Sequence, residues 1–460
     1  MVYLCFISHN FRDVANNIRD FSEHGGDIFV KANILNLIKK YYGSYFPANA
    51  GNKEFFFAAL NLSIPFLMGL YVFLTPLPLS SLSEICFYVS LSCLLVLLVF
   101  KKTDFALRSP LTLPFVLFFS WAAFGLFFTL DFHNTLHDLR AHLLDYLIIF
   151  YLLVNYFNSQ KKMEYLSRIV VASAAVFVIG GIIIFYFIEG NPFHARFGQN
   201  FRAMYTGFMC FTTIFAATIS LHHMGATSHK AMKVFYAFCF FLLCTATLLN
   251  QSRGALIGLF LAIAIMCLHR KNNVIILIVA VVILFSIPGP LDRIEERGLT
   301  RDVRPKMFRL SWEVIKDYPV FGVGYGGEIY RKPDLIDLKT YNKKLPKKYR
   351  QKPGRIINST HNTFLDVAIR TGLVGLALFC WITLTSFWML WDVFRRREEE
   401  FFRSWAICLF ASFTAFMVQA IFNDALYGTQ VIAMYVNLAM IAILWNLARE
   451  KQTNSRAGTA

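Results

Sequence analysis

Charge and paired cysteines are scarce in this sequence. Only 16% of its 460 residues are charged, and its nine cysteines lie mostly inside apolar runs. An odd number of cysteines, without pairs in the loops, argues against a disulfide scaffold. The spacing of histidine and cysteine matches no zinc or iron–sulfur ligand set, so we expect no metal and no cofactor. We interpret the cysteines as small core residues.

The first 50 residues lack an apolar stretch of the length that a signal peptide needs. We therefore expect the chain to insert through its own membrane spans. Within this region, the segment ILNLIKKYYGSYF at 34–46 combines charged and aromatic residues. Two interpretations stay open, a helix on the membrane surface and a solvated tail.

Long apolar runs dominate the remaining sequence, which is 57% apolar and 17% aromatic overall. A helix needs about 20 apolar residues to cross a hydrocarbon core of ~30 Å. The runs are too long and too continuous for barrel strands, which would alternate. We predict an all-α polytopic membrane protein with about 12 transmembrane helices, at 55–75, 82–100, 111–130, 141–157, 166–188, 203–221, 233–250, 254–269, 273–289, 373–394, 404–423 and 428–448.

Basic residues concentrate in alternate short loops, for example KKTDFALR, QKKMEYLSR and FRRREEEFFR. Cytoplasmic loops collect Lys and Arg, so we place both termini in the cytoplasm. The formal net charge of +17 then reflects topology, and we expect no nucleic-acid partner. The predicted organisation is a cytoplasmic segment, nine membrane helices, one large basic periplasmic loop, three more helices and a cytoplasmic tail, at residues 1–53, 54–289, 290–362, 363–448 and 449–460.

Four arginines oppose this charge pattern, because they lie in short loops of the other face. They are Arg140, Arg196, Arg202 and Arg253. Each either pairs with a nearby acid or a lipid phosphate, or binds an anionic substrate. Arg253 lies in QSRG, which leaves about three residues between two spans and so fixes the place of its guanidinium. Permanent charge and fork geometry suit arginine to phosphate and pyrophosphate.

The large loop carries 17 Lys and Arg against nine acids. Met307, Leu310, Val314 and Ile315 recur at helical spacing and predict a helix over 305–317, which Asp317-Tyr-Pro ends. The following glycine run, FGVGYGG, allows a tight turn that could approach a ligand closely. The stretch NKKLPKKYRQKPGR has no apolar periodicity. It is either a solvated mobile lid or a docking surface for a polyanionic acceptor.

The stretch NSTHNTFLDVAIRTGLVGL at 358–376 carries polar residues into a membrane helix. If the helix begins near Asn358 or Thr360, Asn362, Asp366 and Arg370 share one face. Asp366 and Arg370 then pair along the helix, whereas His361 has no such local partner. A histidine that titrates near neutral pH can deprotonate or position an attacking hydroxyl. Two glycines, at 372 and 375, would let the helix pack closely on a neighbour.

Three patches resemble the O-antigen ligase and polymerase superfamily. His361-Asn362, followed by Gly372 and Gly375, is similar to the signature that O-antigen ligases share with bacterial protein O-oligosaccharyltransferases. SRGALIGL at 252–259 and PVFGVGYGG at 319–327 resemble the two other recurrent patches, and the hydropathy layout is similar over about 50–450.

The resemblance implies a GT-C-like glycosyltransferase of the bacterial inner membrane, metal-independent and inverting, with a periplasmic active site. Such a ligase moves a polysaccharide from undecaprenyl pyrophosphate to a sugar hydroxyl of lipid A–core, at the membrane lipid surface. By this resemblance His361 and Arg253 are catalytic, and Arg196 is a looser match that contacts substrate. The predicted substrate-binding set is completed by Arg140, Arg202, Asn362, Arg304 and Arg309.

The loop helix departs from the family pattern at one position. The family often has an arginine four residues before the tryptophan of this helix, and here Phe308 stands there, flanked by Arg304 and Arg309. Which of the two arginines reaches the substrate is therefore left open.

Three alternatives remain. An O-antigen or exopolysaccharide polymerase would share the donor chemistry and use a growing glycan as acceptor. A protein O-oligosaccharyltransferase generally continues well past its last span. A transporter or flippase fits twelve spans, but few spans here carry ionisable residues near their centres, and no convincing inverted repeat is present.

Overall fold

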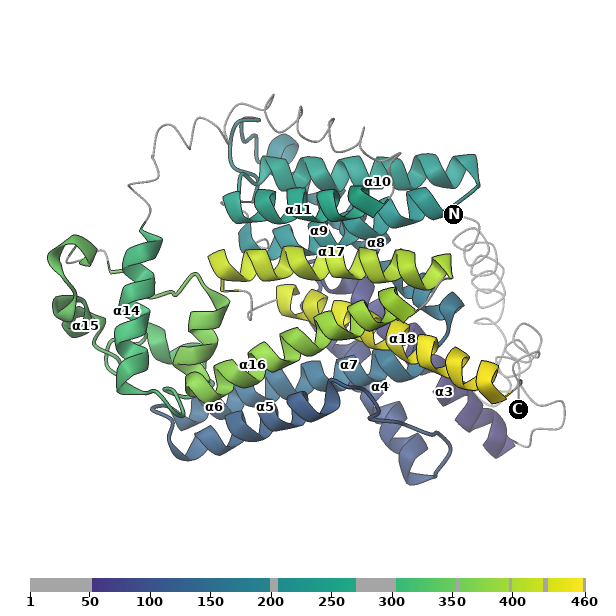
Figure 1. The fold of residues 1–460 in the computed structure, drawn as a ribbon, viewed down its shortest axis with the longest axis horizontal. Coiled ribbons are helices and arrows are strands. Elements are labelled where there is room, and N and C mark those ends of the chain that lie inside the picture. The colour runs from purple at the N-terminus through teal and green to yellow at the C-terminus, as the bar shows by residue number, and fades with distance from the viewer. Residues whose placement is uncertain are drawn as a thin grey trace, which may run out of the picture. The chain divides into compact units, whose positions relative to one another are not determined.

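The computed structural model describes residues 52–198, 206–269, 303–352, 356–396, 399–424 and 429–457, and in these ranges every regular element is helical (Figure 1). Eleven of the twelve predicted spans overlap these helices. The predicted span at 273–289 and the segment at 34–46 lie outside the described residues. Eight described helices are long and apolar enough to cross a membrane, and two shorter apolar helices accompany them.

The helices of the apolar part follow the predicted order. They are α3 (Asn52–Leu74), α4 (Ser80–Val99), α5 (Thr112–Phe124), α6 (Phe132–Leu139), α7 (Asp145–Tyr156), α8 (Gln160–Ile182), α9 (Thr206–Ala226), α10 (Lys230–Leu249), α11 (Arg253–His269), α16 (Thr363–Arg396), α17 (Glu400–Phe422) and α18 (Thr429–Ala457). A π-helical turn, η3 (Arg140–Leu144), joins α6 to α7, and a second one, η4 (Ile183–Ile188), follows α8.

The chain divides into two compact units. The smaller unit is Met1–Ser63 with Cys93–Thr103, and its described part holds the beginning of α3 and the end of α4. There the Lys102 ammonium lies 5.7 Å from the ring centre of Phe57. The larger unit, Ile64–Ser92 with Asp104–Ala460, contains all the predicted site residues and the helices from α5 onwards.

In the larger unit, α17 lies between the α9–α11 group and α16 (Figure 1). A Cβ on Gly258 of α11 would meet the carbonyl oxygen of Ala415 at 3.0 Å, so this glycine permits the close approach of α11 to α17. Phe211 of α9 packs edge-on against Phe416 of α17 at 4.6 Å between ring centres. The apolar faces of these helices therefore bury one another around α17.

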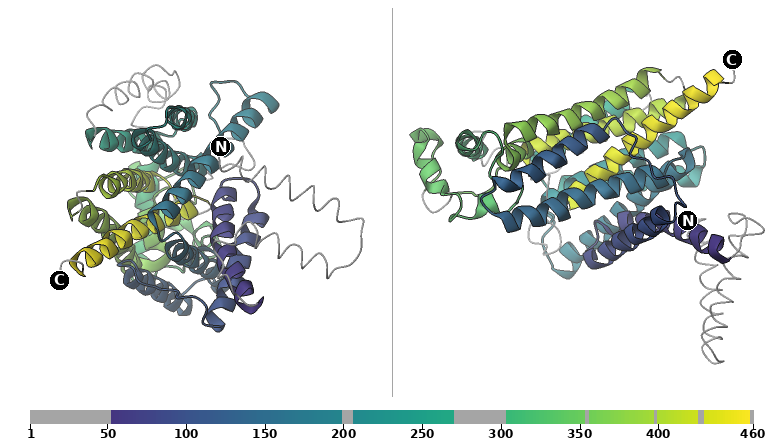
Figure 2. Two further views of the ribbon diagram at one scale, coloured as in Figure 1. Left: turned by 90° about the vertical axis from the view of Figure 1, so that its right-hand side faces the viewer. Right: turned by 90° about the horizontal axis from the view of Figure 1, so that it is seen from below.

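The described part of the large loop forms a small folded body, here called the loop domain (residues 303–362). It contains α14 (Arg304–Asp317), η7 (Ile329–Arg331), α15 (Leu338–Lys344) and η8 (Lys347–Tyr349), and it lies at one end of the helices of the larger unit (Figures 1 and 2). The predicted helix over 305–317 is confirmed. The four apolar residues that predicted it are all buried, namely Met307, Leu310, Val314 and Ile315.

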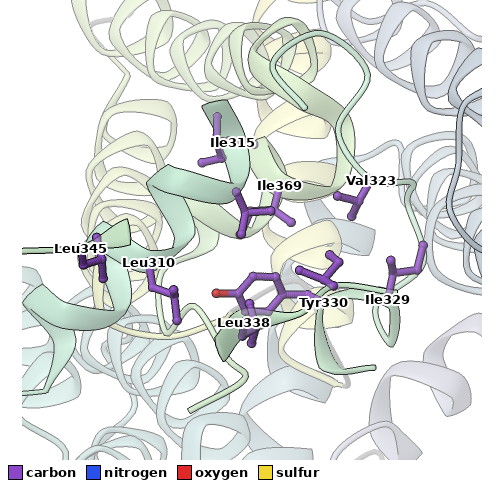
Figure 3. Packing of buried hydrophobic residues seen from close by; sticks show 11 residues of the cluster. Leu310, Ile315, Val323, Ile329, Tyr330, Leu338, Leu345 and Ile369 are labelled. Atoms are coloured by element: carbon purple, nitrogen blue, oxygen red, sulfur yellow. The ribbon is translucent and has the colours of Figure 1, made fainter. Parts of the chain in front are cut away.

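The core of the loop domain is built from α14, the segment after it, and Ile369 of α16 (Figure 3). The basic stretch NKKLPKKYRQKPGR contributes Leu345 to this core. Asn342 and Gln351 also exchange two hydrogen bonds, of 2.9 and 2.8 Å. The described residues of this stretch are therefore attached to the fold of the loop domain, and whether the stretch serves as a lid or as a docking surface stays a prediction. Its apolar contribution is a single buried leucine, too little to give a periodic signal.

The glycine run attaches the loop domain to the membrane helices. Val323 N–H donates to Ile369 O at 2.8 Å, and Leu130 N–H donates to Val323 O at 3.0 Å. A Cβ on Gly322 would overlap the carbonyl oxygen of Ile369, and Gly372 has φ +72° opposite Val320. The close approach that these glycines allow is therefore made to the backbone of α16. An approach of the run to a ligand stays a prediction.

Candidate functional site

The C-terminal end of α17, residues Ile421–Asp424, is the point at which several of the predicted site residues meet. We call it the α17 end. Three helices begin beside it, α11 at Arg253, α14 at Arg304 and α16 at Thr363. Helix N-termini carry unpaired N–H groups and a partial positive charge, so their meeting favours an anion.

Asp424 fixes the turn that carries His361. Its carboxylate accepts hydrogen bonds from the Ser359 hydroxyl at 2.5 Å, from the Thr360 hydroxyl, and from the backbone N–H of Asn362 at 3.1 Å. Hydrogen bonds to a charged acceptor are the stronger ones, about 1.5–3 kcal/mol each. One side chain thus holds three of the residues that surround His361.

Two further hydrogen bonds tie the turn to the backbone of the α17 end. The Asn362 amide donates to Ile421 O at 3.1 Å, and the Thr363 hydroxyl donates to Asn423 O at 2.8 Å. The other end of the Asn362 amide, its Oδ1, accepts the N–H of Leu365 at 3.0 Å. Asn362 is consequently the N-cap of α16.

The helix begins at Thr363, the predicted boundary of the last three membrane helices, and later than the start near Asn358 or Thr360 that we had considered. The turn prevents an earlier start, because His361 has φ +44° and cannot belong to a right-handed helix. Asp366 and Arg370 lie in α16, whereas Asn362 precedes it. The side chain of His361 is exposed, so it is available to a ligand.

Arg253 and Arg304 both start helices that contact Phe422. A Cβ on Gly254, the residue after Arg253, would meet Phe422 Cβ at 3.0 Å. The guanidinium of Arg304 lies 5.5 Å from the centre of the Phe422 ring. The structure therefore brings the starts of α11 and α14, with their arginines, to the same α17 end as the His361 turn.

Arg196 is fixed to the junction that precedes Arg253. Its Nε donates to Asn250 O at 2.8 Å, and the Asn250 amide donates to Phe197 O at 2.9 Å. Gln251 adds a hydrogen bond of 3.1 Å to His194 O. The loop of Arg196 and the start of α11 are thus one connected structure. Arg202 lies outside the described residues.

The surroundings of Arg140 and Arg309 differ from those of the residues at the α17 end. Arg140 is exposed in the π-helical turn and lies beside Tyr88 and Asp145. Arg309 is exposed on α14, with its guanidinium 3.8 Å from the centre of the Tyr349 ring. Of the two loop arginines, Arg304 is the one in contact with the α17 end.

The predicted pair of Asp366 and Arg370 is confirmed, at 3.5 Å. Arg370 is buried, and its Nε donates to Tyr325 O at 2.6 Å. Its Nη2 lies 3.8 Å from Oδ2 of Asp138, a partner that we had not predicted. Burial raises the pKa of Tyr325 to about 12 against the opposing charge of Arg370, so its phenol is neutral. This network joins α6, α16 and the loop domain.

Asp424 is the residue that sequence reasoning missed. It lies in NDALYG, a short loop between two predicted spans that carries no positive charge. This loop lies on the same predicted face as the anomalous arginines and has one charged residue. That single acid was the signal in the sequence that could have indicated Asp424.

The described elements are all helical and several are long enough to span a bilayer, which indicates a multi-pass membrane protein. Polar residues meet at one end of these helices. Residues 238–380 match the family model described as O-antigen ligase. The match runs from α10 into α16, so it includes Arg253, the loop domain and His361. Among curated proteins, no sequence matches the chain.

The matched segment ends before α17, so the family model does not include Asp424.

Proposed function

We propose that the protein is an O-antigen ligase of the bacterial inner membrane, GT-C-like in architecture, with its active site at the periplasmic α17 end. It transfers a polysaccharide from undecaprenyl pyrophosphate to a sugar hydroxyl of lipid A–core. The observation that carries the proposal is the meeting of the His361 turn with the starts of α11 and α14 at Ile421–Asp424.

The leaving group of the donor is undecaprenyl pyrophosphate, which gains negative charge while the bond between the sugar and the phosphate breaks. Arg253 and Arg304 supply fixed positive charge, and the helix starts add N–H groups. Groups that stabilise charge appearing in the transition state make the largest catalytic contribution in many enzymes. In this proposal the arginines perform the task without a metal ion. Arg196, and Arg202 outside the described residues, assist in holding the pyrophosphate.

The acceptor hydroxyl attacks the anomeric carbon from the side opposite the pyrophosphate, and the configuration there is inverted. His361 accepts the hydroxyl proton as the carbon–oxygen bond forms, and undecaprenyl pyrophosphate is released. Asn362 and Asp424 serve this step by fixing the turn from which the imidazole projects. The imidazole is exposed, as an acceptor of the size of lipid A–core requires.

The test uses purified full-length protein with lipid-linked polysaccharide and lipid A–core. His361→Ala and Arg253→Ala should each reduce transfer by at least about 10²-fold, the usual effect of removing a positioned base or a charge-stabilising donor. Matched controls are His229→Ala and Arg168→Ala, which remove an exposed histidine and an exposed arginine paired with Glu164. Wild-type transfer by both site variants would reject the proposal.

A polymerase is the second candidate, because the family match fits both activities. A deletion strain separates them by its lipopolysaccharide pattern. Loss of a ligase leaves long chains on the carrier lipid and bare core, whereas loss of a polymerase leaves single repeats attached to core. Flipping of lipid-linked glycan by the purified protein, without transfer, would instead identify a flippase.

A further inference from the structure

Three potential metal ligands lie together at the junction of α6 and α7. Nδ1 of His137 is 3.0 Å from Oδ1 of Asp138, and Nε2 of His142 is 3.7 Å from the same oxygen. One ligand atom from each residue lies within 4.8 Å of the other two. These residues take no part in the proposed transfer reaction, so a metal site here is independent of it.

His137 lies in the last turn of α6, and His142 lies in the π-helical turn Arg140–Leu144 that follows it. They are five residues apart, a spacing that a regular α-helix would place about 140° apart around its axis. In the structure both imidazoles nevertheless meet the same carboxylate oxygen, and their ring centres are 6.1 Å apart. We had expected no metal because no spacing of histidine and cysteine matched a zinc ligand set, whereas this cluster adds an aspartate to two histidines.

The carboxylate of Asp138 is held from its other side. Its Oδ2 accepts the N–H of Gly327 at 2.7 Å and lies 3.8 Å from Nη2 of Arg370. Oδ1, which faces the two histidines, is thus oriented by contacts made at Oδ2. The second nitrogen of His142, Nδ1, is 3.3 Å from the hydroxyl of Tyr146. Outer hydrogen bonds of this kind orient the ligands of protein metal sites.

Exposure differs across the three residues in a way that suits an ion entering from solvent. The side chain of Asp138 is 8% exposed, that of His142 34% and that of His137 62%. The carboxylate of Asp138 thus lies on the buried side of the cluster, and the imidazole of His137 lies on the side that faces solvent. Three protein ligands with an open position for water are a usual arrangement for zinc.

We propose that His137, Asp138 and His142 bind a divalent transition-metal ion of the Zn²⁺ type. Zn²⁺ bonds nitrogen and carboxylate oxygen at about 2.0–2.2 Å, so tetrahedral ligand atoms are about 3.3 Å apart. The observed 3.0 and 3.7 Å bracket that separation. Two imidazoles select against Mg²⁺ and Ca²⁺, which prefer oxygen ligands.

The positive charge of Arg370 is directed away from the proposed ion. It faces Oδ2 of Asp138, and its Nη1 pairs with Asp366 at 3.5 Å. The ion would bind Oδ1 and hold the carboxylate that contacts Gly327 and Arg370. Its binding therefore stabilises the attachment of the loop domain to α6 and α16.

The experiment uses the full-length protein in detergent, purified without a polyhistidine tag and stripped with a chelator. Zn²⁺ is titrated by calorimetry, and Co²⁺ is added in parallel to record its visible absorption. We expect one ion per chain, with X-ray absorption showing two imidazole ligands. His137→Gln and His142→Gln should weaken Zn²⁺ binding by more than about 100-fold, since even outer-sphere changes cost 10–100-fold.

His133→Gln is the matched control, because His133 is an exposed histidine on the same helix and is not in the ligand cluster. It should bind Zn²⁺ as the wild type does, and all variants should elute at the same volume in gel filtration. Zn²⁺ should also raise the unfolding temperature of wild type and of His133→Gln, but not of His142→Gln. Either substoichiometric binding by wild type, or equal loss in the His133 and His137 variants, overturns the assignment.

Discussion

The backbone N–H of Asn362 donates a hydrogen bond of 3.1 Å to Oδ1 of Asp424, 62 residues further along the chain. The hydroxyls of Ser359 and Thr360 donate to the same carboxylate. The orientation of His361 is therefore set by a residue of another segment. That makes Asp424 a positioning residue for His361, with consequences that differ from those of losing the histidine itself.

Asp424→Ala should reduce transfer by about 10²-fold, because displacement of a reacting group by about 1 Å has an effect of that size. Asp424→Asn should fall between wild type and the alanine variant, since an amide oxygen still accepts one of the hydrogen bonds but without charge. The measurement is the rate of polysaccharide transfer to lipid A–core at equal protein. Wild-type rates for Asp424→Ala would show that the turn keeps its shape without the carboxylate.

His361 offers a way to separate backbone strain from side-chain chemistry. Its φ of +44° lies in the left-handed region, which glycine adopts without penalty. His361→Gly should therefore exceed His361→Ala in free energy of unfolding by about 1 kcal/mol. Both variants should lose transfer alike, because both lack the imidazole. Thermal unfolding in detergent and the transfer assay, run on the same preparations, give the two readings. Equal stability of the two variants would argue against a strained turn.

The helical architecture was predictable from sequence because membrane helices require long, continuous apolar runs. Helix α14 was predictable for a related reason, since four apolar residues at helical spacing formed a buried face. The fold of NKKLPKKYRQKPGR was not, because it depends on single contacts, such as those between Asn342 and Gln351. The π-helical turn at Arg140–Leu144 also leaves no mark in a periodicity based on α-helix.

The candidate site was predictable only in part. Topology singled out Arg253 as an arginine out of place, and resemblance singled out His361. Neither pattern predicts that both segments meet the C-terminal end of α17, since that contact joins residues far apart in sequence. Asp424 was not predicted as a site residue for the same reason. Its role consists of hydrogen bonds to a distant turn.

Removal of Arg370 should destabilise the protein through its buried partners. Arg370→Met leaves Asp366 and Asp138 without the guanidinium and should lower the free energy of unfolding by about 3–5 kcal/mol. Adding Asp366→Asn should restore about 0.5–3 kcal/mol, the usual coupling between contacting residues. Denaturant or thermal unfolding of the single and double variants measures this coupling. Strictly additive losses would show that the pair does not interact.

Gly372 provides a final test of how the loop domain is attached. It has φ +72°, and a Cβ there would overlap the carbonyl oxygen of Val320 in the segment after α14. Gly372→Ala therefore combines backbone strain with a steric clash and should cost about 2–4 kcal/mol.

The matched control is Gly180→Ala. Gly180 lies in α8 with no neighbouring atom within 4 Å of an added Cβ, and alanine favours a helix over glycine by up to about 1 kcal/mol. Gly180→Ala should thus unfold at or above the wild-type temperature, and Gly372→Ala well below it. If the two variants unfolded at the same temperature, the close approach of Val320 to α16 would not be what holds the loop domain in place. The order of the two unfolding temperatures therefore tests that contact by itself, whatever reaction the protein performs.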